Sequence, residues 1–238
     1  MTGIGTVVNV AAIIIGGIIG YVLKGGLKPH YQDAVIKVLG LATLFIGAAG
    51  ALAGMFSVEG GVLTTNSSLG MILSLVLGTL IGEFFDFDEK MERLGRWLKE
   101  KASRGEDGQF VEGFVTASLT VCIGAMAIVG SLQDALSPDP STLFTKSILD
   151  FMIVMIFAST YGKGAIFSAL PVGVLQGGVT VCAGFLAPFF SDAVIANLSA
   201  LGSILIFCVG VNLAFGSRFR VANMLPALVV GAVCTALF

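Results

Sequence analysis

The sequence of 238 residues contains few charged side chains: Asp, Glu, Lys and Arg make up 12%, against about 25% in a typical soluble domain. It has one histidine, and its four cysteines form no CxxC pair. It also has no H-E-x-x-H motif and no P-loop. These absences argue against an enzyme, an ATP-driven pump and a metalloprotein. We therefore expect no catalytic residue, no metal and no cofactor.

A basic patch with interleaved aromatic residues is missing as well, and the net charge is -2, so nucleic acid is not an expected partner. What is abundant is apolar sequence: 56% of the residues are hydrophobic, 32 are glycine, and the mean hydropathy is +0.98. Several apolar runs exceed the roughly 18 residues that indicate a membrane-spanning helix. The first expected partner is therefore the lipid bilayer.

The hydropathy pattern predicts an all-α, polytopic membrane protein that forms one integral domain over residues 1–238. Eight transmembrane helices are predicted, at 3–23, 33–54, 67–85, 112–131, 143–161, 165–189, 194–215 and 221–238. The first is not a cleavable signal, because Lys24 follows the apolar stretch instead of preceding it.

The basic residues predict the orientation, because Lys and Arg in short loops stay on the cytoplasmic side. With eight spans, all basic residues except Lys146 fall on one side of the membrane. Both termini are therefore expected outside. The outer loops then hold a small number of acidic residues: Glu59, Asp134, Asp139 and Asp192.

Residues 86–109 are predicted to form a cytoplasmic amphipathic helix and linker between spans three and four. The expected i, i+4 acid–base pairs are Asp86/Lys90, Glu89/Arg93, Glu92/Arg96 and Glu100/Arg104. Either the apolar stripe of this helix rests on the lipid headgroups with Trp97 at the interface, or the helix docks a partner or a gate. Periodicity does not separate the two.

Polar residues inside apolar runs are the functional candidates, because an unsatisfied polar group in hydrocarbon is costly. The sequence offers Asn9, Asp150, Gln176, Asn212 and Asn223.

Asp150 stands out because it lies about seven residues, or roughly 10 Å, into its predicted helix. Lys146 precedes it by one turn, so an i, i+4 ion pair is expected, with Lys146 snorkelling toward the outer surface. Two interpretations stay open here. The pair positions the helix, or Asp150 is a cation or proton site that faces a cavity.

Span six carries Pro171 and the adjacent Gly177 and Gly178, and span eight carries Pro226 near its start. Proline removes a backbone donor, and glycine lowers helix propensity. Two interpretations of span six stay open: a helix break whose free backbone groups bind substrate or ion, or an ordinary span, since glycine and proline are common in membrane helices. At Pro226 a proline near a helix start is favoured over a similar break.

Small residues recur four apart at Gly16/Gly20, Gly50/Gly54, Gly78/Gly82 and Gly173/Gly177, which is typical of close helix packing. Spans two and three also resemble spans four and five, as in Ile46-Gly47-Ala48 and Ile123-Gly124-Ala125, which suggests internal repeats. All four cysteines fall in spans and are expected to be free packing residues.

Several segments together resemble a known family: Gly5-Thr6-Val7-Val8-Asn9, Gly82-Glu83, FVTASLTVCIGAMAIVGSLQDAL at 114–136, KSILDFMIVMIFASTYGKGAIFSALPVGVLQGG at 146–178 and RVANMLPAL at 220–228. The chain resembles the YdfK/YqgA-like bacterial membrane proteins over nearly its whole length. The resemblance implies the bacterial cytoplasmic membrane and no assigned activity.

The leading hypothesis is a small channel or secondary transporter for an ion or small polar solute, either as a single chain or as a homo-oligomer. The alternative is a structural or regulatory membrane protein whose cytoplasmic helix recruits a partner.

Overall fold

The computed structural model describes residues 3–24, 29–59, 62–65, 68–102, 108–122, 125–136, 139–186, 188, 190–216 and 218–237. These residues form the helices of a polytopic membrane protein, which confirms the predicted fold class. One feature was not predicted. An antiparallel hairpin of β1 (Phe56–Glu59) and β2 (Val62–Thr65), with Phe56 paired to Thr65, joins the second and third helices.

Four helical segments are long and apolar enough to cross a bilayer: α1 (Ile4–Lys24), α7 (Ser141–Tyr161), α10 (Asp192–Phe215), and the 3-10 helix η1 (Lys163–Ser168) together with α8 (Ala169–Val181). The count among the described residues rises to six if two bent pairs each form one span. These pairs are α3 (Ser68–Phe85) with α4 (Phe87–Ala102), and α5 (Phe110–Cys122) with α6 (Ala125–Leu136). The predicted number of eight spans is therefore not confirmed.

The chain divides into two compact units, each built from segments that are distant in sequence. Unit 1 comprises Met1–Ile36, Glu89–Cys122 and Met126–Ala187, and ends with the short helix α9 (Ala183–Leu186). Unit 2 comprises Lys37–Asp88, Ile123–Ala125 and Pro188–Phe238. Most of α2 (Pro29–Met55) belongs to unit 2, as do α11 (Val221–Met224) and α12 (Pro226–Leu237). That the whole chain acts as one domain stays a prediction.

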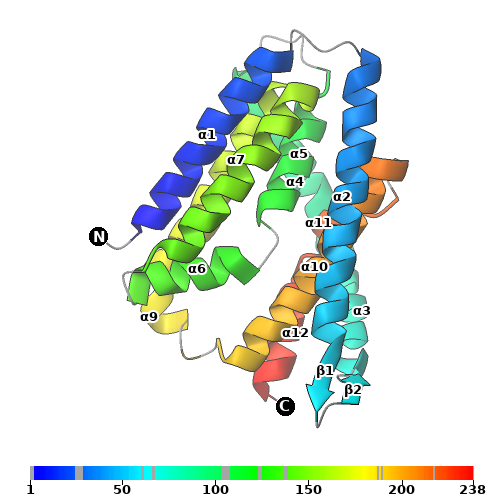
Figure 1. Cartoon of the computed structure of the whole chain (residues 1–238), viewed down its shortest axis with the longest axis vertical. Coiled ribbons are helices and arrows are strands. Elements are labelled where there is room, and N and C mark those ends of the chain that lie inside the picture. Colours follow the sequence, from blue (N-terminus) through cyan, green and yellow to red (C-terminus); the bar gives the residue numbers. More distant parts are fainter. Residues whose placement is uncertain are drawn as a thin grey trace. The chain divides into compact units, whose positions relative to one another are not determined.

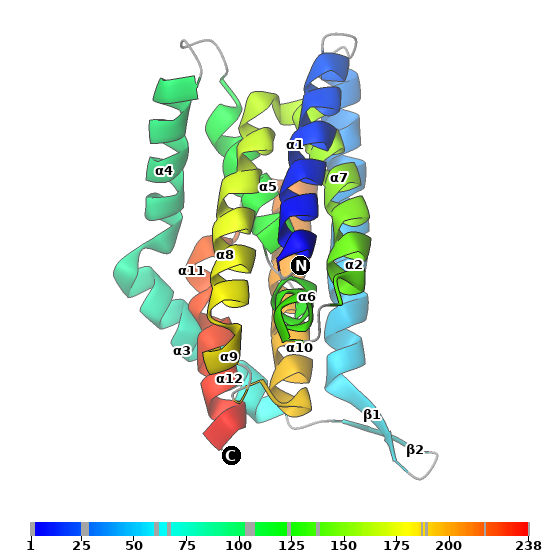
Figure 2. The same ribbon diagram turned by 90° about the vertical axis from the view of Figure 1, so that its left-hand side faces the viewer.

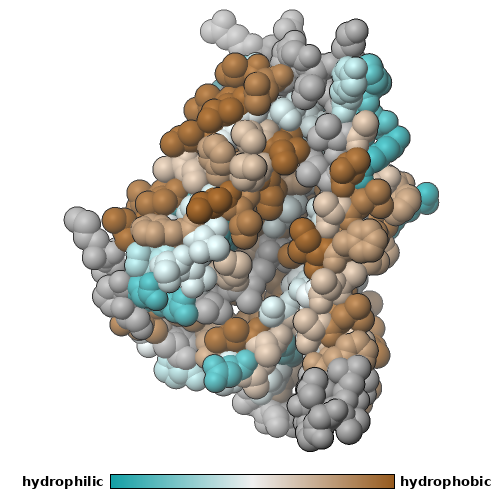
Figure 3. Space-filling model, in the orientation of Figure 1, coloured by the Kyte–Doolittle hydropathy of each residue, from teal (hydrophilic) through white to brown (hydrophobic). Residues whose placement is uncertain are grey.

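The first helix of unit 1, α1, has two contrasting faces. On one face, Val7 is 67% exposed and Val22 is 72% exposed. On the other face, Asn9, Ile13 and Gly16 are buried. Exposed apolar side chains cover the visible part of this helix in Figure 3. This distribution suits lipid on one side of α1 and protein on the other.

The buried face of α1 packs against α7, and the two helices lie side by side (Figure 1). A Cβ on Gly16 or Gly20 would overlap a backbone carbonyl of α7, at Phe151 or Met155. Glycine is needed at both positions because it lets the two backbones touch. Since Gly16 meets Phe151 and Gly20 meets Met155, α1 and α7 run parallel.

Helix α8 packs on α1 in the opposite direction, with Gly173 against Val10 and the beginning of α1 near the end of α8. Figure 2 shows α8 on one side of α1 and α7 on the other. Unit 1 thus has α1 at the centre of a three-helix layer, where a polar side chain on its buried face can reach both neighbours.

The amphipathic helix α4 packs against α5 within unit 1. Leu98 is buried with Phe110 and Phe114, and Met91 lies partly buried beside them. The interpretation that this stripe rests on lipid headgroups is therefore wrong for Met91 and Leu98, although Trp97 on the same helix is 48% exposed. Two predicted pairs, Glu89/Arg93 at 3.6 Å and Glu92/Arg96 at 3.1 Å, are confirmed.

Unit 2 is assembled by the same close approach of small residues. Along α2, Gly40, Gly47, Gly50 and Gly54 lie in order against Ala214, Phe207, Ser203 and Ala200 of α10, so the two helices are antiparallel. On α3, Gly78 and Gly82 contact the backbone of α12 and α11. The packing interpretation is confirmed for three of the four glycine pairs. The exception is Gly173/Gly177, because a Cβ on Gly177 would meet no described atom within 4 Å. The internal repeats stay a prediction.

Candidate functional site: a buried polar centre in unit 1

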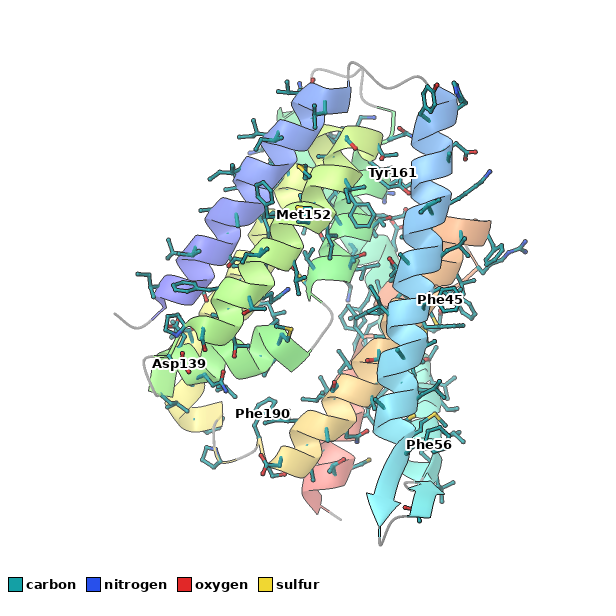
Figure 4. All side chains as sticks on the ribbon, in the orientation of Figure 1. Phe45, Phe56, Asp139, Met152, Tyr161 and Phe190 are labelled. Carbon is teal, nitrogen blue, oxygen red and sulfur yellow. The ribbon has the colours of Figure 1, made fainter. Side chains whose placement is uncertain are left out.

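The site is organised by α7, whose buried residues recur at helical spacing and include Leu143, Lys146, Asp150, Val154 and Phe157. Asp150 lies nine residues after Ser141, near the middle of a 21-residue helix that is about 30 Å long. Figure 4 shows Asp139 beside the start of this helix and Tyr161 at its far end. The exposed Asp139 accepts a hydrogen bond from Ser141 N–H at 3.0 Å, and the Ser141 side chain and N–H lower its pKa.

Lys146 and Asp150 form an ion pair that is almost fully buried. Lys146 Nζ donates to Asp150 Oδ1 at 2.8 Å and to Oδ2 at 2.7 Å, and the two residues are 7% and 3% exposed. The prediction that Lys146 snorkels outward is therefore wrong.

The physical reason lies at the end of α5. Lys146 Nζ also donates to Val121 O at 2.8 Å. Val121 lies in the last turn of α5, where a carbonyl has no intrahelical partner and the helix dipole is negative. The ammonium group is thus held by three oxygens inside the protein, and it does not need to reach water.

Asn9 of α1 joins the pair from the other side. Its side chain is fully buried, and Nδ2 donates to Asp150 Oδ2 at 2.9 Å and to Gln176 Oε1 at 3.3 Å. A carboxylate only accepts hydrogen bonds, so the amide nitrogen of Asn9 must face Asp150. The same reasoning fixes Gln176, whose oxygen must face Asn9.

We call Asn9, Lys146, Asp150 and Gln176 the polar centre. It is electrically neutral, since it pairs one ammonium with one carboxylate, and its members come from α1, α7 and α8. Within the described residues, Asn9 Oδ1 and Gln176 Nε2 are buried and make no hydrogen bond. A buried polar atom without a partner costs about 1–3 kcal/mol, so these two atoms are candidate ligand contacts.

The predicted break in span six is not where the sequence placed it. Helix α8 runs unbroken from Ala169 to Val181 through Pro171, Gly177 and Gly178. Pro171 is tolerated because it is the third residue of α8, within the first turn, where the backbone N–H groups have no intrahelical acceptor. The irregular part is the 3-10 segment η1, immediately before α8.

In unit 2, Asn223 is also fully buried, and it lies just before the α11–α12 junction at Leu225 and Pro226. Its Oδ1 accepts a hydrogen bond from Asp88 N–H at 2.7 Å, and Nδ2 has no partner among the described residues. Helix α12 begins at Pro226, so this proline occupies the first position of a helix. Arg220, immediately before α11, pairs with Glu83 at 2.8 Å and with Asp86.

Asn212 stabilises the connection that follows α10 by hydrogen bonding to its backbone. Its Oδ1 accepts hydrogen bonds from Arg218 N–H and Phe219 N–H, and its Nδ2 donates to Phe219 O at 2.7 Å. These bonds use both polar atoms of the side chain for the turn, which favours a structural role for Asn212 over a place in a path.

The sequence analysis did not identify Asp134, Thr6 and Thr180 of unit 1 as buried polar residues. Asp134, predicted in an outer loop, is fully buried in α6, and its Oδ2 accepts a hydrogen bond from Gly5 N–H at 2.9 Å at the start of α1. Thr6 and Thr180 each bury a hydroxyl that has no partner in the described structure. Leu132 and Leu136 are four residues apart, an i, i+4 spacing that is typical of a helix running through Asp134.

The described residues contain no cluster of three or more His, Cys, Asp or Glu side chains that could hold a metal ion. The four cysteines are free, with Cys208 buried and Cys182 exposed. Burial inside a span was predicted for all four, and it is wrong for Cys182, which follows the last residue of α8.

Comparison with known proteins places this architecture in a family. Residues 4–236 match the model described as "Protein of unknown function (DUF554)". The chain belongs to this family. It is 28% identical over 226 residues to the uncharacterized membrane protein YdfK of Bacillus subtilis (strain 168), with 95% of this chain and 93% of the relative covered.

A second relative of the DUF554 chain is the uncharacterized protein YqgA of Escherichia coli (strain K12). The two are 28% identical over 234 residues, which cover 95% of this chain and 94% of YqgA. No solved structure matches the chain significantly. The resemblance read from the sequence is thus confirmed, and the functional argument rests on the polar centre.

Proposed function

We propose that this DUF554 protein is a small channel or secondary transporter that moves an ion or a small polar solute across the bacterial cytoplasmic membrane. The observation that supports this most is the polar centre. It holds a buried ion pair near the middle of α7 and two buried amide atoms that have no hydrogen-bond partner among the described residues. Such groups are rare in membrane helices and mark substrate paths or proton relays.

The geometry offers a mechanism for coupling. Both oxygens of Asp150 are occupied by Lys146, and one also accepts from Asn9. A proton or cation that binds Asp150 would compete with the Lys146 ammonium. Released from Asp150, Lys146 would keep Val121 O as its one acceptor among the described residues. Opening and closing of this pair is therefore the step that would link a bound species to a change in conformation.

The orientation belongs to the same proposal. The distribution of the basic residues favours both termini outside, so α1 and α7 would both run inward and α8 outward. The parallel packing of α1 with α7 and the antiparallel packing of α8 agree with these directions. The polar centre would then be reached from outside past the N-terminal ends of α1 and α7.

The test is flux into liposomes that contain the purified protein, measured with a pH-sensitive dye and with potassium- and sodium-sensitive dyes. Asp150→Asn keeps a hydrogen-bonding side chain of the same size but removes the negative charge. We expect it to abolish flux. Glu92→Gln is the matched control, because Glu92 forms an exposed i, i+4 pair with Arg96 at 3.1 Å.

Full flux in Asp150→Asn would refute a role for this carboxylate in transport. Loss of flux in both Asp150→Asn and Glu92→Gln would point to a general effect of charge removal.

The second candidate is a structural or regulatory protein that recruits a partner through α4. One observation favours it: Leu94 and Trp97 of this helix are 41% and 48% exposed, although Leu98 is buried. Under this proposal, Leu94→Ser/Trp97→Ser would abolish the cellular role while any liposome flux persists. Under the transport proposal, Asp150→Asn would have that effect instead.

A further inference from the structure

Unit 1 concentrates the buried polar atoms that lack partners. Seven such side-chain atoms occur among the described residues, and six of them belong to unit 1. Four of the six lie on α1 and α8: Thr6 Oγ1, Asn9 Oδ1, Gln176 Nε2 and Thr180 Oγ1. Since each unpaired atom costs about 1–3 kcal/mol, their gathering on two helices in contact calls for a functional explanation.

These four residues line up along the α1–α8 contact. Asn9 Nδ2 donates to Gln176 Oε1 at 3.3 Å, and a Cβ on Gly3 would lie 3.6 Å from Thr180 Cγ2. Thr6 lies three residues before Asn9, so these two share a face of α1. Thr180 follows Gln176 by one turn of α8. We call Thr6, Asn9, Gln176 and Thr180 the polar track.

The polar track connects two further polar groups. At its deep end Asn9 donates to Asp150, which is paired with Lys146. At the start of α1, Asp134 accepts a hydrogen bond from Gly5 N–H through Oδ2, and its buried Oδ1 has no partner in the described structure. The track covers about 4.5 Å of α1 from Thr6 to Asn9 and about 6 Å of α8 from Gln176 to Thr180.

The chemistry of the polar track suits an uncharged ligand. Hydroxyl groups both donate and accept, Asn9 offers an acceptor, and Gln176 offers a donor. A cation would meet the Gln176 amide and then the Lys146 ammonium, whereas an anion would meet the carboxylates of Asp134 and Asp150. A neutral molecule that carries both donors and acceptors can satisfy every unpaired atom of the track without facing a like charge.

We propose that the polar track binds small neutral solutes that both donate and accept hydrogen bonds, of the size of urea or glycerol, and delivers them to the Lys146–Asp150 pair. This inference rests on the proposed transport function and names its substrate class. The solute replaces the missing partners of Thr6, Asn9, Gln176 and Thr180.

The experiment measures swelling of proteoliposomes by stopped-flow light scattering under inward gradients of urea and of glycerol, next to the ion fluxes described above. Thr180→Val removes one unpaired hydroxyl at constant shape. The matched control is Thr160→Val, whose hydroxyl already donates to Ile156 O at 3.1 Å. We expect Thr180→Val to lower urea and glycerol permeability about two- to tenfold, the effect of one hydrogen bond. Thr160→Val should leave it unchanged.

Gln176→Leu removes the only unpaired donor of the amide pair, and a larger decrease is expected. If this variant does not fold, Thr180→Val against Thr160→Val carries the test, because valine matches the shape of threonine. Equal urea and glycerol permeability of Thr180→Val and the wild type would overturn the proposal that the polar track binds these solutes.

Ion flux that depends on Asp150, without any urea or glycerol permeation, would overturn the neutral-solute inference and leave the proposed function standing. No flux of any species would overturn both.

Discussion

The Lys146–Asp150 pair allows the sharpest test of stability. In Asp150→Leu the buried ammonium loses both carboxylate oxygens and, of its described partners, keeps Val121 O alone. In Lys146→Met the carboxylate keeps only the Asn9 N–H donor among its described side-chain partners. Removal of one partner from a buried pair costs about 3–5 kcal/mol. At about 2–4 °C per kcal/mol for a chain of this length, each single variant should melt roughly 6–20 °C lower.

The double variant Lys146→Met/Asp150→Leu should recover much of this loss. Replacing a whole buried pair by apolar residues is often neutral or stabilising, by about 1–4 kcal/mol. Against this, Val121 O loses its donor, at about 1–3 kcal/mol. The two effects nearly cancel, so we expect the double variant within about 2 kcal/mol of the wild type.

The assay is thermal unfolding in detergent for all four members of the double-mutant cycle. The exposed pair Glu92/Arg96 provides the control cycle, for which a coupling energy below about 1 kcal/mol is expected. Additive destabilisation by Lys146→Met and Asp150→Leu would refute the reasoning, because it would mean that the two charges do not compensate each other in the folded protein.

Three further outcomes are expected. Gly20→Ala should lower the free energy of unfolding by several kcal/mol, because the added methyl overlaps the α7 backbone. In Gly177→Ala the added methyl meets no described atom, so the free energy of unfolding should stay unchanged or rise by up to about 1 kcal/mol, the gain in helix propensity. A periplasm-only reporter fused to either terminus should be active, and activity of a cytoplasm-only reporter there would reverse the orientation. A water-soluble maleimide should label the exposed Cys182 in the native protein and the buried Cys208 only after denaturation, and equal rates would contradict their different burial.

The polar centre shows which structural features can be predicted from local sequence. Lys146 and Asp150 are four residues apart on one helix, so their pairing follows from the period of the α-helix alone. Membrane insertion and the helical fold class likewise follow from long apolar runs, which only a helix can satisfy in lipid. The glycine pairs predicted close packing, although they did not name the partner helices.

The direction of Lys146 required the tertiary structure. An isolated helix would send this side chain toward water. The unpaired carbonyl of Val121 at the end of α5, 25 residues away in sequence, holds it inside. The same holds for Asp134, which looked like a loop residue until the first turn of α1 supplied its hydrogen-bond donor.

The sequence by itself determined which residues are too polar for their surroundings: Asn9, Asp150 and Gln176 each interrupt an apolar run. Only the tertiary structure decided that they meet, because Asn9 lies 141 residues from Asp150 and 167 from Gln176. Their meeting depends on α1 packing closely on α7 through glycine while α8 approaches from its other side. Hydrophobic periodicity specifies that a helix face is buried, but the neighbour that covers it is chosen by shape complementarity between segments distant in sequence.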